Sequence, residues 1–104
     1  MMETQKFIWM DGKLVPWGEA NVHFLTHSLH YGTGVFEGIR FYKTPKGPAI
    51  FRLPEHIDRL YESAKAFAME IPFSKDEFSR AIIETIIANE LEEGYIRPLV
   101  YLGG

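Results

Sequence analysis

Residues 35–42, with the sequence Val-Phe-Glu-Gly-Ile-Arg-Phe-Tyr, are rich in β-branched and aromatic side chains and predict a strand. Residues 43–47 (Lys-Thr-Pro-Lys-Gly) follow as a turn, and residues 49–51 (Ala-Ile-Phe) as a short return strand. The stretch 35–51 therefore predicts a β-hairpin, and the rest of the chain is interpreted around it.

A second hairpin is predicted on the amino-terminal side of this stretch. Residues 7–10 (Phe-Ile-Trp-Met) and 13–15 (Lys-Leu-Val) flank the pair Asp11-Gly12. An Asp-Gly pair between two such runs is a strong short-range hairpin signal, because both residues tolerate the positive φ angles of a tight turn.

Two helices and a last strand are predicted on the carboxy-terminal side. Pro54 suits a first helical position, and apolar residues then recur at helical spacing up to Ala68. Ser74 and Glu77 have the spacing of a capping box that opens a second helix. Residues 95–102 read as a strand. This order predicts an α+β domain in which two helices pack on an antiparallel sheet.

The composition excludes several classes of protein. The chain has 104 residues, 46% hydrophobic and 24% charged, which suits one globular domain. Its net charge is −3 without a clustered basic face, so no nucleic-acid partner is expected. Cysteine is absent, which excludes disulfides and thiolate metal sites. We find no signal peptide and no apolar run near the ~20 residues a bilayer requires, and we expect a cytoplasmic protein without a membrane segment.

Strand alternation places an arginine beside aromatic residues on two of the predicted strands. One face of residues 35–42 carries Phe36, Gly38, Arg40 and Tyr42, and one face of residues 95–102 carries Tyr95, Arg97, Leu99 and Tyr101. These faces would suit a ligand with a carboxylate and an apolar tail, because a guanidinium binds the carboxylate and the rings cover the tail. Gly38 would leave room for close approach to the backbone. The alternative is that both arginines pair with surface acids, and periodicity alone favours it.

Arg59 and Glu37 are further candidates for polar interactions. Arg59 lies within helical reach of Glu55 and Glu62, so spacing favours a surface ion pair over a phosphate contact. Glu37 falls on the apolar face of its predicted strand and must find a partner if it is buried.

No metal site or nucleotide site is predicted. His23, His27 and His30 would share one face of a helix, and three imidazoles can bind zinc. No capping signal precedes them, and structural or surface histidines are the favoured interpretation. The glycines at 32, 34 and 38 do not have the spacing of a nucleotide-binding loop.

Residues 26–40 (Thr-His-Ser-Leu-His-Tyr-Gly-Thr-Gly-Val-Phe-Glu-Gly-Ile-Arg) closely resemble the branched-chain amino acid aminotransferase family. The likeness continues through residues 51–60, 63–65 and 95–99 and includes residues 8–12, so it covers essentially the whole chain. These enzymes are fold-type IV pyridoxal-phosphate proteins that transfer the amino group of Leu, Ile or Val to 2-oxoglutarate, which gives a branched-chain 2-oxo acid and glutamate. The resemblance implies that residues 1–104 form the smaller, N-terminal domain of such an enzyme.

The resemblance also implies a role for individual residues. Arg59 would contact the phosphate of pyridoxal 5′-phosphate, in place of the surface ion pair. The implied substrate-binding residues are Phe36 and Gly38 along the pocket, Tyr95 and Arg40 near the α-carboxylate, and Arg97 at the side-chain carboxylate of glutamate. Tyr31 would reach into the pocket of a neighbouring subunit, which implies a homo-oligomer built from dimers, with hexamers as a further form.

One departure from the family decides what this chain could do alone. Pyridoxal-phosphate catalysis needs a lysine amine, and none of the six lysines here matches the family's cofactor-binding lysine, which lies in the larger C-terminal domain. No catalytic residue is therefore expected in this chain, and it should be inactive by itself. Two alternatives stay open, namely another fold-type IV enzyme (an amine or D-amino acid transaminase) and a stand-alone, non-enzymatic binding or assembly domain. Residues 27–34 favour the branched-chain family among the enzymes.

Overall fold

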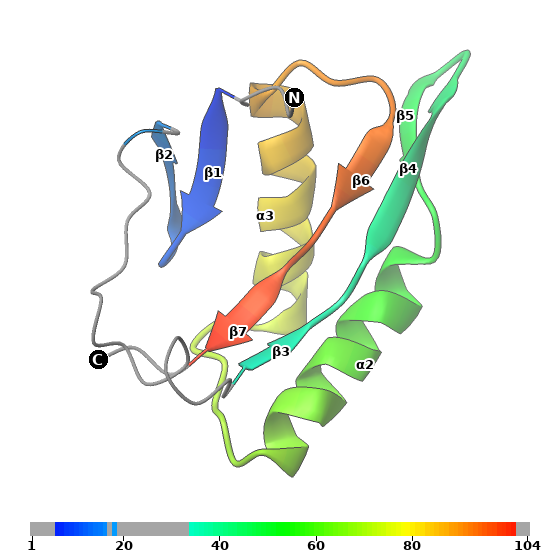
Figure 1. Cartoon of the computed structure of the whole chain (residues 1–104). Helices are drawn as coiled ribbons and strands as arrows, with labels where there is room; N and C mark the ends of the chain where they lie inside the picture. The colour runs from blue at the N-terminus through cyan, green and yellow to red at the C-terminus, as the bar shows by residue number, and fades with distance from the viewer. Residues whose placement is uncertain (1–5, 17, 19–33, 102–104) are drawn as a thin grey trace.

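The computed structural model describes residues 6–16, 18 and 34–101 (Figure 1). Its strands are β1 (Phe7–Met10), β2 (Lys13–Pro16), β3 (Gly34–Phe36), β4 (Ile39–Thr44), β5 (Gly47–Ile50), β6 (Gly94–Ile96) and β7 (Leu99–Tyr101), and its helices are α2 (Leu53–Ala66) and α3 (Lys75–Ala88). All strand pairs are antiparallel, and two helices pack against them. The predicted α+β class is confirmed.

A long two-stranded ribbon joins β3 and β4 to β6 and β7. β4 pairs with β6 through Ile39 and Ile96, and β3 pairs with β7 through Val35 and Val100. Both pairings have the same register, so Glu37 stands opposite Pro98. β5 extends this ribbon on the outer side of β4, while β1 and β2 form a separate hairpin, as the Asp-Gly signal predicted.

The prediction of one unbroken strand over residues 35–42, and of another over residues 95–102, is wrong. The first strand is interrupted at residues 37–38 and the second at residues 97–98. Proline provides the physical reason, because it has no N–H to donate to the ladder. The Glu37 N–H donates to the Pro98 carbonyl at 3.2 Å, and Pro98 cannot return the bond.

Helix α3 begins as the sequence indicated, whereas α2 begins one residue before Pro54, after a left-handed Arg52, and ends early. The Ser74 side chain accepts a hydrogen bond from the Glu77 N–H at 3.1 Å, and the Glu77 carboxylate accepts one from the Ser74 N–H at 3.0 Å, which completes the capping box. Helix α2 stops at Ala66, and Ala68 adopts a left-handed backbone with φ 56°. The expected apolar contribution of residues 67 and 68 is therefore absent, and buried Met69 takes its place in the core.

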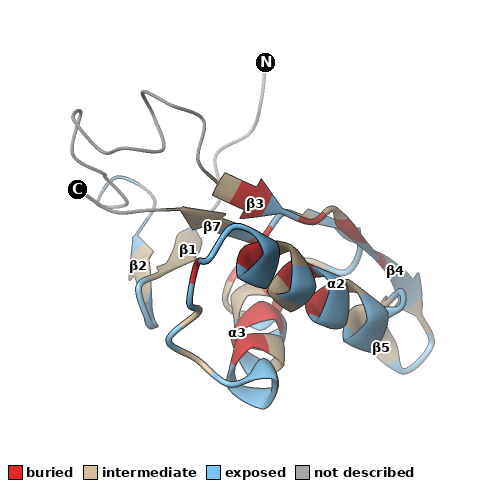
Figure 2. Cartoon of the chain, turned by 90° about the horizontal axis from the view of Figure 1, so that it is seen from below, coloured by how far each residue is buried: buried red, intermediate tan, exposed pale blue. Residues whose placement is uncertain are grey.

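The core lies between the ribbon and the two helices. Figure 2 shows buried residues on α2 and α3 and, among the strands, on β3 and β4. The largest fully buried side chains come from β4 and α2; they are Phe41, Ile39, Ile57 and Leu60. Asn89, at the end of α3, ties the first hairpin to this core, because its side chain accepts from the Phe7 N–H at 2.9 Å and donates to the Phe7 carbonyl at 3.0 Å. Neither described helix has the length and apolarity that a membrane crossing requires.

Candidate active site

The outward face of the ribbon carries the residues that strand alternation grouped together. On the inward side Val35, Glu37, Ile39 and Phe41 are buried, and the side chains between them face outward, with Phe36 55% exposed. The alternation continues across the interruption at residues 37–38 because the ladder keeps one register on both sides of it. The predicted face is thus confirmed as a geometric unit.

Arg97 lies at the centre of this outward face. Its guanidinium carbon is 4.7 Å from the ring centroid of Phe36 and 5.7 Å from that of Tyr95, and its Nη2 donates to the Tyr95 hydroxyl at 3.1 Å. Arg40 lies 6.0 Å from the same Tyr95 ring. Aromatic rings stabilise a guanidinium through their negative faces while leaving most of its N–H donors available.

The alternative of surface ion pairs is not supported for these two arginines. Within the residues that the structure describes, neither Arg40 nor Arg97 forms a salt bridge, whereas six other pairs do. Two cations held by aromatic rings, without a carboxylate beside them, form a surface that can accept an anion.

Gly38 is required by the position of Tyr95. A Cβ at residue 38 would lie 2.1 Å from the Tyr95 hydroxyl oxygen and 2.8 Å from the ring carbon that bears it. The sequence suggested that Gly38 leaves space for close approach, and in this structure Tyr95 occupies that space. The glycine thus sets where the hydroxyl that Arg97 binds can lie.

Sequence reasoning missed one aromatic residue of this face. Phe51 is the residue opposite Arg40, since Phe41 pairs with Ile50 in the hairpin and the Phe51 N–H donates to the Arg40 carbonyl at 2.9 Å. Its exposed ring lies 6.4 Å from that of Tyr42. The length of the turn could have identified Phe51. A turn over residues 43–47 was predicted, but the turn between β4 and β5 has only two residues, and this shorter turn sets the strand register that places Phe51 opposite Arg40.

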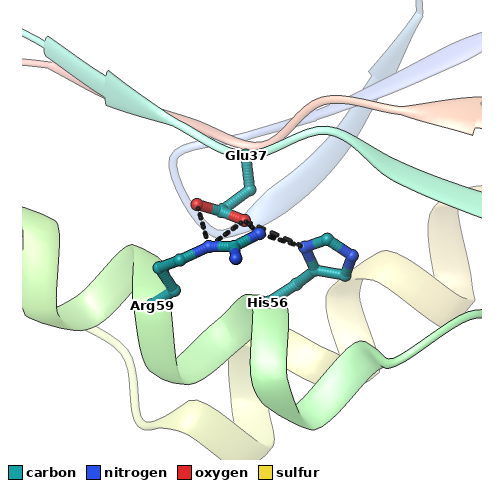
Figure 3. A network of polar contacts seen from close by, with 3 residues as sticks. All are labelled: Glu37, His56 and Arg59. Carbon is teal, nitrogen blue, oxygen red and sulfur yellow. Dashed lines mark hydrogen bonds and ion pairs between the residues drawn. The ribbon is translucent and has the colours of Figure 1, made fainter.

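Glu37, His56 and Arg59 form a polar cluster on the helix side of the ribbon (Figure 3). The Arg59 Nε donates to both carboxylate oxygens of Glu37 at 3.1 Å, and its Nη2 donates to Oε1 at 2.8 Å. The His56 Nδ1 lies 2.9 Å from the same Oε1. Arg59 therefore pairs with Glu37, and the pairing with Glu55 or Glu62 that helical spacing favoured is wrong. Arg59 does not join the outward face of Phe36 and Arg97.

The charges of the cluster determine which hydrogen bond His56 makes. Its Nδ1 is 2.9 Å from the Glu37 oxygen and 3.2 Å from the Arg59 Nη2, and it cannot donate to one and accept from the other at once. The hydrogen bond from Arg59 holds the pKa of Glu37 below its usual value, with a smaller contribution from His56, so the carboxylate is ionised at neutral pH and only accepts. The His56 Nδ1 therefore carries its hydrogen and donates a hydrogen bond to the Glu37 carboxylate.

The lowered pKa of Glu37 predicts acid sensitivity of the fold. A carboxylate whose pKa is lower in the folded than in the unfolded chain stabilises the fold fully above the unfolded value, about 4.3, and loses that effect as the pH falls through the folded value. We expect the free energy of unfolding of Glu37→Gln to lie below that of the parent at pH 7, and this difference to shrink by about pH 3. Urea unfolding of both proteins at the two pH values measures it. A difference that stays constant with pH would contradict the assignment.

Arg59 can hold an anion while it is paired with Glu37. Its side chain is 64% exposed, and Nη1 forms no hydrogen bond with any of the described residues. An exposed guanidinium with a free Nη1 fits one face of a phosphate group.

Four candidate residues from the sequence lie in a part of the chain that the structure does not describe. Tyr31 and the histidines at 23, 27 and 30 lie outside the described residues. Over residues 6–16, 18 and 34–101, no group of three or more His, Asp or Glu side chains could hold a metal ion.

Comparison with known proteins identifies the chain's relatives. The family model described as amino-transferase class IV matches residues 34–104. A branched-chain-amino-acid aminotransferase of Pseudomonas aeruginosa is 52% identical over 99% of this chain and 34% of its own length, and that of Escherichia coli K12 is 47% identical over 98% and 34%. The chain thus spans about a third of the length of the curated relatives it matches, and it corresponds to their N-terminal part.

Solved structures show the same fold. A T.th. branched-chain amino acid aminotransferase, complexed with N-(5′-phosphopyridoxyl)-L-glutamate, has a TM-score of 0.95 at 53% identity and covers 98% of this chain, which spans 35% of that one. The enzyme of Thermoproteus uzoniensis with norvaline has a TM-score of 0.91 at 42% identity, with 97% and 34% covered. Both likenesses extend over nearly every described element.

Proposed function

Since the chain belongs to the amino-transferase class IV family, we propose that it forms the smaller, N-terminal domain of a branched-chain amino acid transaminase. The longer protein would transfer the amino group of Leu, Ile or Val to 2-oxoglutarate, with branched-chain 2-oxo acids and glutamate as the products. It would work as a dimer-based homo-oligomer in the cytoplasm, with Tyr31 reaching a neighbouring subunit. The observation that carries the proposal is the outward face on which Arg97 lies between Phe36 and Tyr95, beside Arg40.

This face suits two substrates that differ in their side chains. An amino acid with an apolar side chain needs the ring of Phe36 and a binding group for its α-carboxylate, for which Tyr95 and Arg40 are the candidates. Glutamate brings a second carboxylate, and Arg97 offers N–H donors next to an aromatic wall. One surface can therefore accept both side chains, because the charged group stands among apolar ones.

The cofactor of the proposed enzyme is pyridoxal 5′-phosphate. When bound, it supplies the carbonyl that takes up the amino group and the electron-poor ring that lets the Cα proton leave. Arg59 is the residue of this chain that would hold the phosphate, and its exposed, partly free guanidinium fits that role. The lysine that attaches the cofactor would come from a larger C-terminal domain, so the 104-residue chain would bind substrate groups but not react.

The test is a comparison of two substrates in the full-length protein with Arg97→Ala. We expect kcat/KM for 2-oxoglutarate to fall tenfold or more, on the order of one lost charge-assisted hydrogen bond, and kcat/KM for leucine to fall only about threefold. The reason is that leucine has no side-chain carboxylate for Arg97 to bind. Arg80→Ala, an exposed arginine on α3, is the matched control and should change neither value.

Either of two results would contradict the proposal. An equal fall in kcat/KM for leucine and 2-oxoglutarate in Arg97→Ala would show that Arg97 does not bind the side-chain carboxylate. Turnover of D-leucine or an (R)-amine by the parent protein, without turnover of L-leucine, would favour the amine or D-amino acid transaminases instead.

A further inference from the structure

We propose that Glu37 and His56 position Arg59 to receive the phosphate group of the cofactor, an inference that rests on the function proposed above. Neither residue would touch the cofactor. Glu37 would act through the guanidinium, by holding it in one orientation before the phosphate arrives, and His56 would act by holding Glu37.

Arg59 needs such support because of where it stands. Its side chain is 64% exposed on α2, and a free arginine populates many rotamers whose freedom is lost on binding. Glu37 holds both Nε and Nη2, so the plane of the guanidinium is fixed by three donor–acceptor contacts. Nη1 then points in one direction only. The conformational entropy of the Arg59 side chain is therefore lost when the chain folds and not when the phosphate binds.

Glu37 is itself held rigidly. Its side chain is only 9% exposed, and its backbone N–H donates to the Pro98 carbonyl within the ribbon. His56, one turn before Arg59 on α2, donates from Nδ1 to Oε1 and is also largely buried. The Glu37 carboxylate therefore connects the ribbon to α2, and its hydrogen bonds hold the Arg59 side chain in place.

Two effects of Glu37 on phosphate binding have opposite signs. Its negative charge partly neutralises Arg59 and repels a second anion, so charge alone predicts that Glu37→Gln strengthens phosphate binding. Positioning predicts that the same change weakens binding. We expect positioning to dominate, because Glu37 contacts the guanidinium at Nε and Nη2 and leaves Nη1 for the phosphate, and because the His56 N–H already offsets part of the carboxylate charge.

The experiment titrates the full-length apoprotein with two probes, pyridoxal 5′-phosphate and pyridoxal, and measures each Kd spectroscopically. Pyridoxal lacks the phosphate, so the ratio of the two Kd values isolates the phosphate contact from the rest of the site. We expect Glu37→Gln to weaken pyridoxal 5′-phosphate about tenfold and pyridoxal less than about twofold. The control is Asp58→Asn, since Asp58 neighbours Arg59 on α2 and pairs with Lys75 in an exposed salt bridge at 3.0 Å. It should change neither Kd.

A double variant separates positioning from a general structural role. If Glu37 acts through Arg59, then Glu37→Gln should add little to the loss of pyridoxal 5′-phosphate affinity that Arg59→Ala already causes. A structural role would weaken both probes alike and would add to the effect of Arg59→Ala. The thermal midpoints of the apoproteins, measured in parallel, show that the variants are folded at the titration temperature.

Three results would overturn the inference. Tighter or unchanged binding of pyridoxal 5′-phosphate by Glu37→Gln would show that charge, or neither effect, dominates. Equal weakening of both probes would assign Glu37 a structural role. The third result is that the parent binds both probes equally and that Arg59→Ala changes neither Kd. This result would overturn the cofactor assignment of Arg59 as well, so it distinguishes failure of the proposed function from failure of positioning alone.

Discussion

Replacement of Gly38 by valine is expected to lower kcat/KM of the proposed full-length transaminase about 100-fold or more for both leucine and 2-oxoglutarate. A Cβ at this position would lie 2.1 Å from the Tyr95 hydroxyl oxygen, far inside van der Waals contact. Tyr95 must then move by more than about 1 Å, since carbon and oxygen atoms need roughly 3.5 Å. The movement breaks the hydrogen bond to Arg97 and displaces the group proposed to face the α-carboxylate, which both substrates share.

The fold should survive this change, because the clashing atom is the end of a half-exposed side chain and not the backbone. Steady-state kinetics, together with the thermal midpoint, measure the two effects separately. Gly18→Ala is the control, since among the described residues no heavy atom would lie within 4 Å of a Cβ there. If Gly38→Val kept the parent's kcat/KM, Tyr95 would have no part in substrate binding.

Replacement of Leu60 by alanine is expected to reduce the free energy of unfolding by about 2–5 kcal/mol. Leu60 is 0% exposed and lies on α2 in the core, together with Ile39, Phe41 and Ile57. Alanine would lose the burial of the larger side chain and leave a cavity that the close-packed neighbours fill only in part. For a domain that folds with typical stability, such a loss removes a large share of it.

Equilibrium urea unfolding of the chain measures this loss as a lower midpoint at an unchanged slope. Phe67→Ala is the control on the same segment, because Phe67 is larger than Leu60 but 64% exposed, just beyond the end of α2. Its replacement should change the free energy of unfolding by less than about 0.5 kcal/mol. An equal loss in both variants would place the core elsewhere.

Local signals in the sequence were sufficient for the elements and for the outward face. The Asp11-Gly12 turn, the capping box of Ser74 and Glu77 and the apolar spacing of the helices each depend on residues within a few positions of one another. Alternation along the strands depends only on the two-residue period of extended backbone. It grouped Phe36, Gly38 and Arg40 correctly, although the strand itself is interrupted.

The errors arose where distant segments meet. Pro98 interrupts the partner strand at residues 37–38, and nothing within residues 35–42 signals that. The two-residue turn between β4 and β5 sets a register that brings Phe51 beside Arg40, which a longer predicted turn concealed. The helix ended at Ala66 because residue 68 adopts a left-handed backbone, and the core used Met69 instead of Phe67.

The sequence by itself determined the α+β class, the two helices, the capping box of α3, and the membership of the arginine and aromatic face, because each follows from short-range periodicity and local hydrogen bonding. Only the tertiary structure decided that Arg59 binds Glu37, 22 positions away, and not the acids of its own helix. A buried carboxylate must be paired, and the partner it finds is the cation that the packing of α2 against the ribbon brings nearest. Spacing along a helix cannot reveal that cation, since it depends on how two separate elements pack in space.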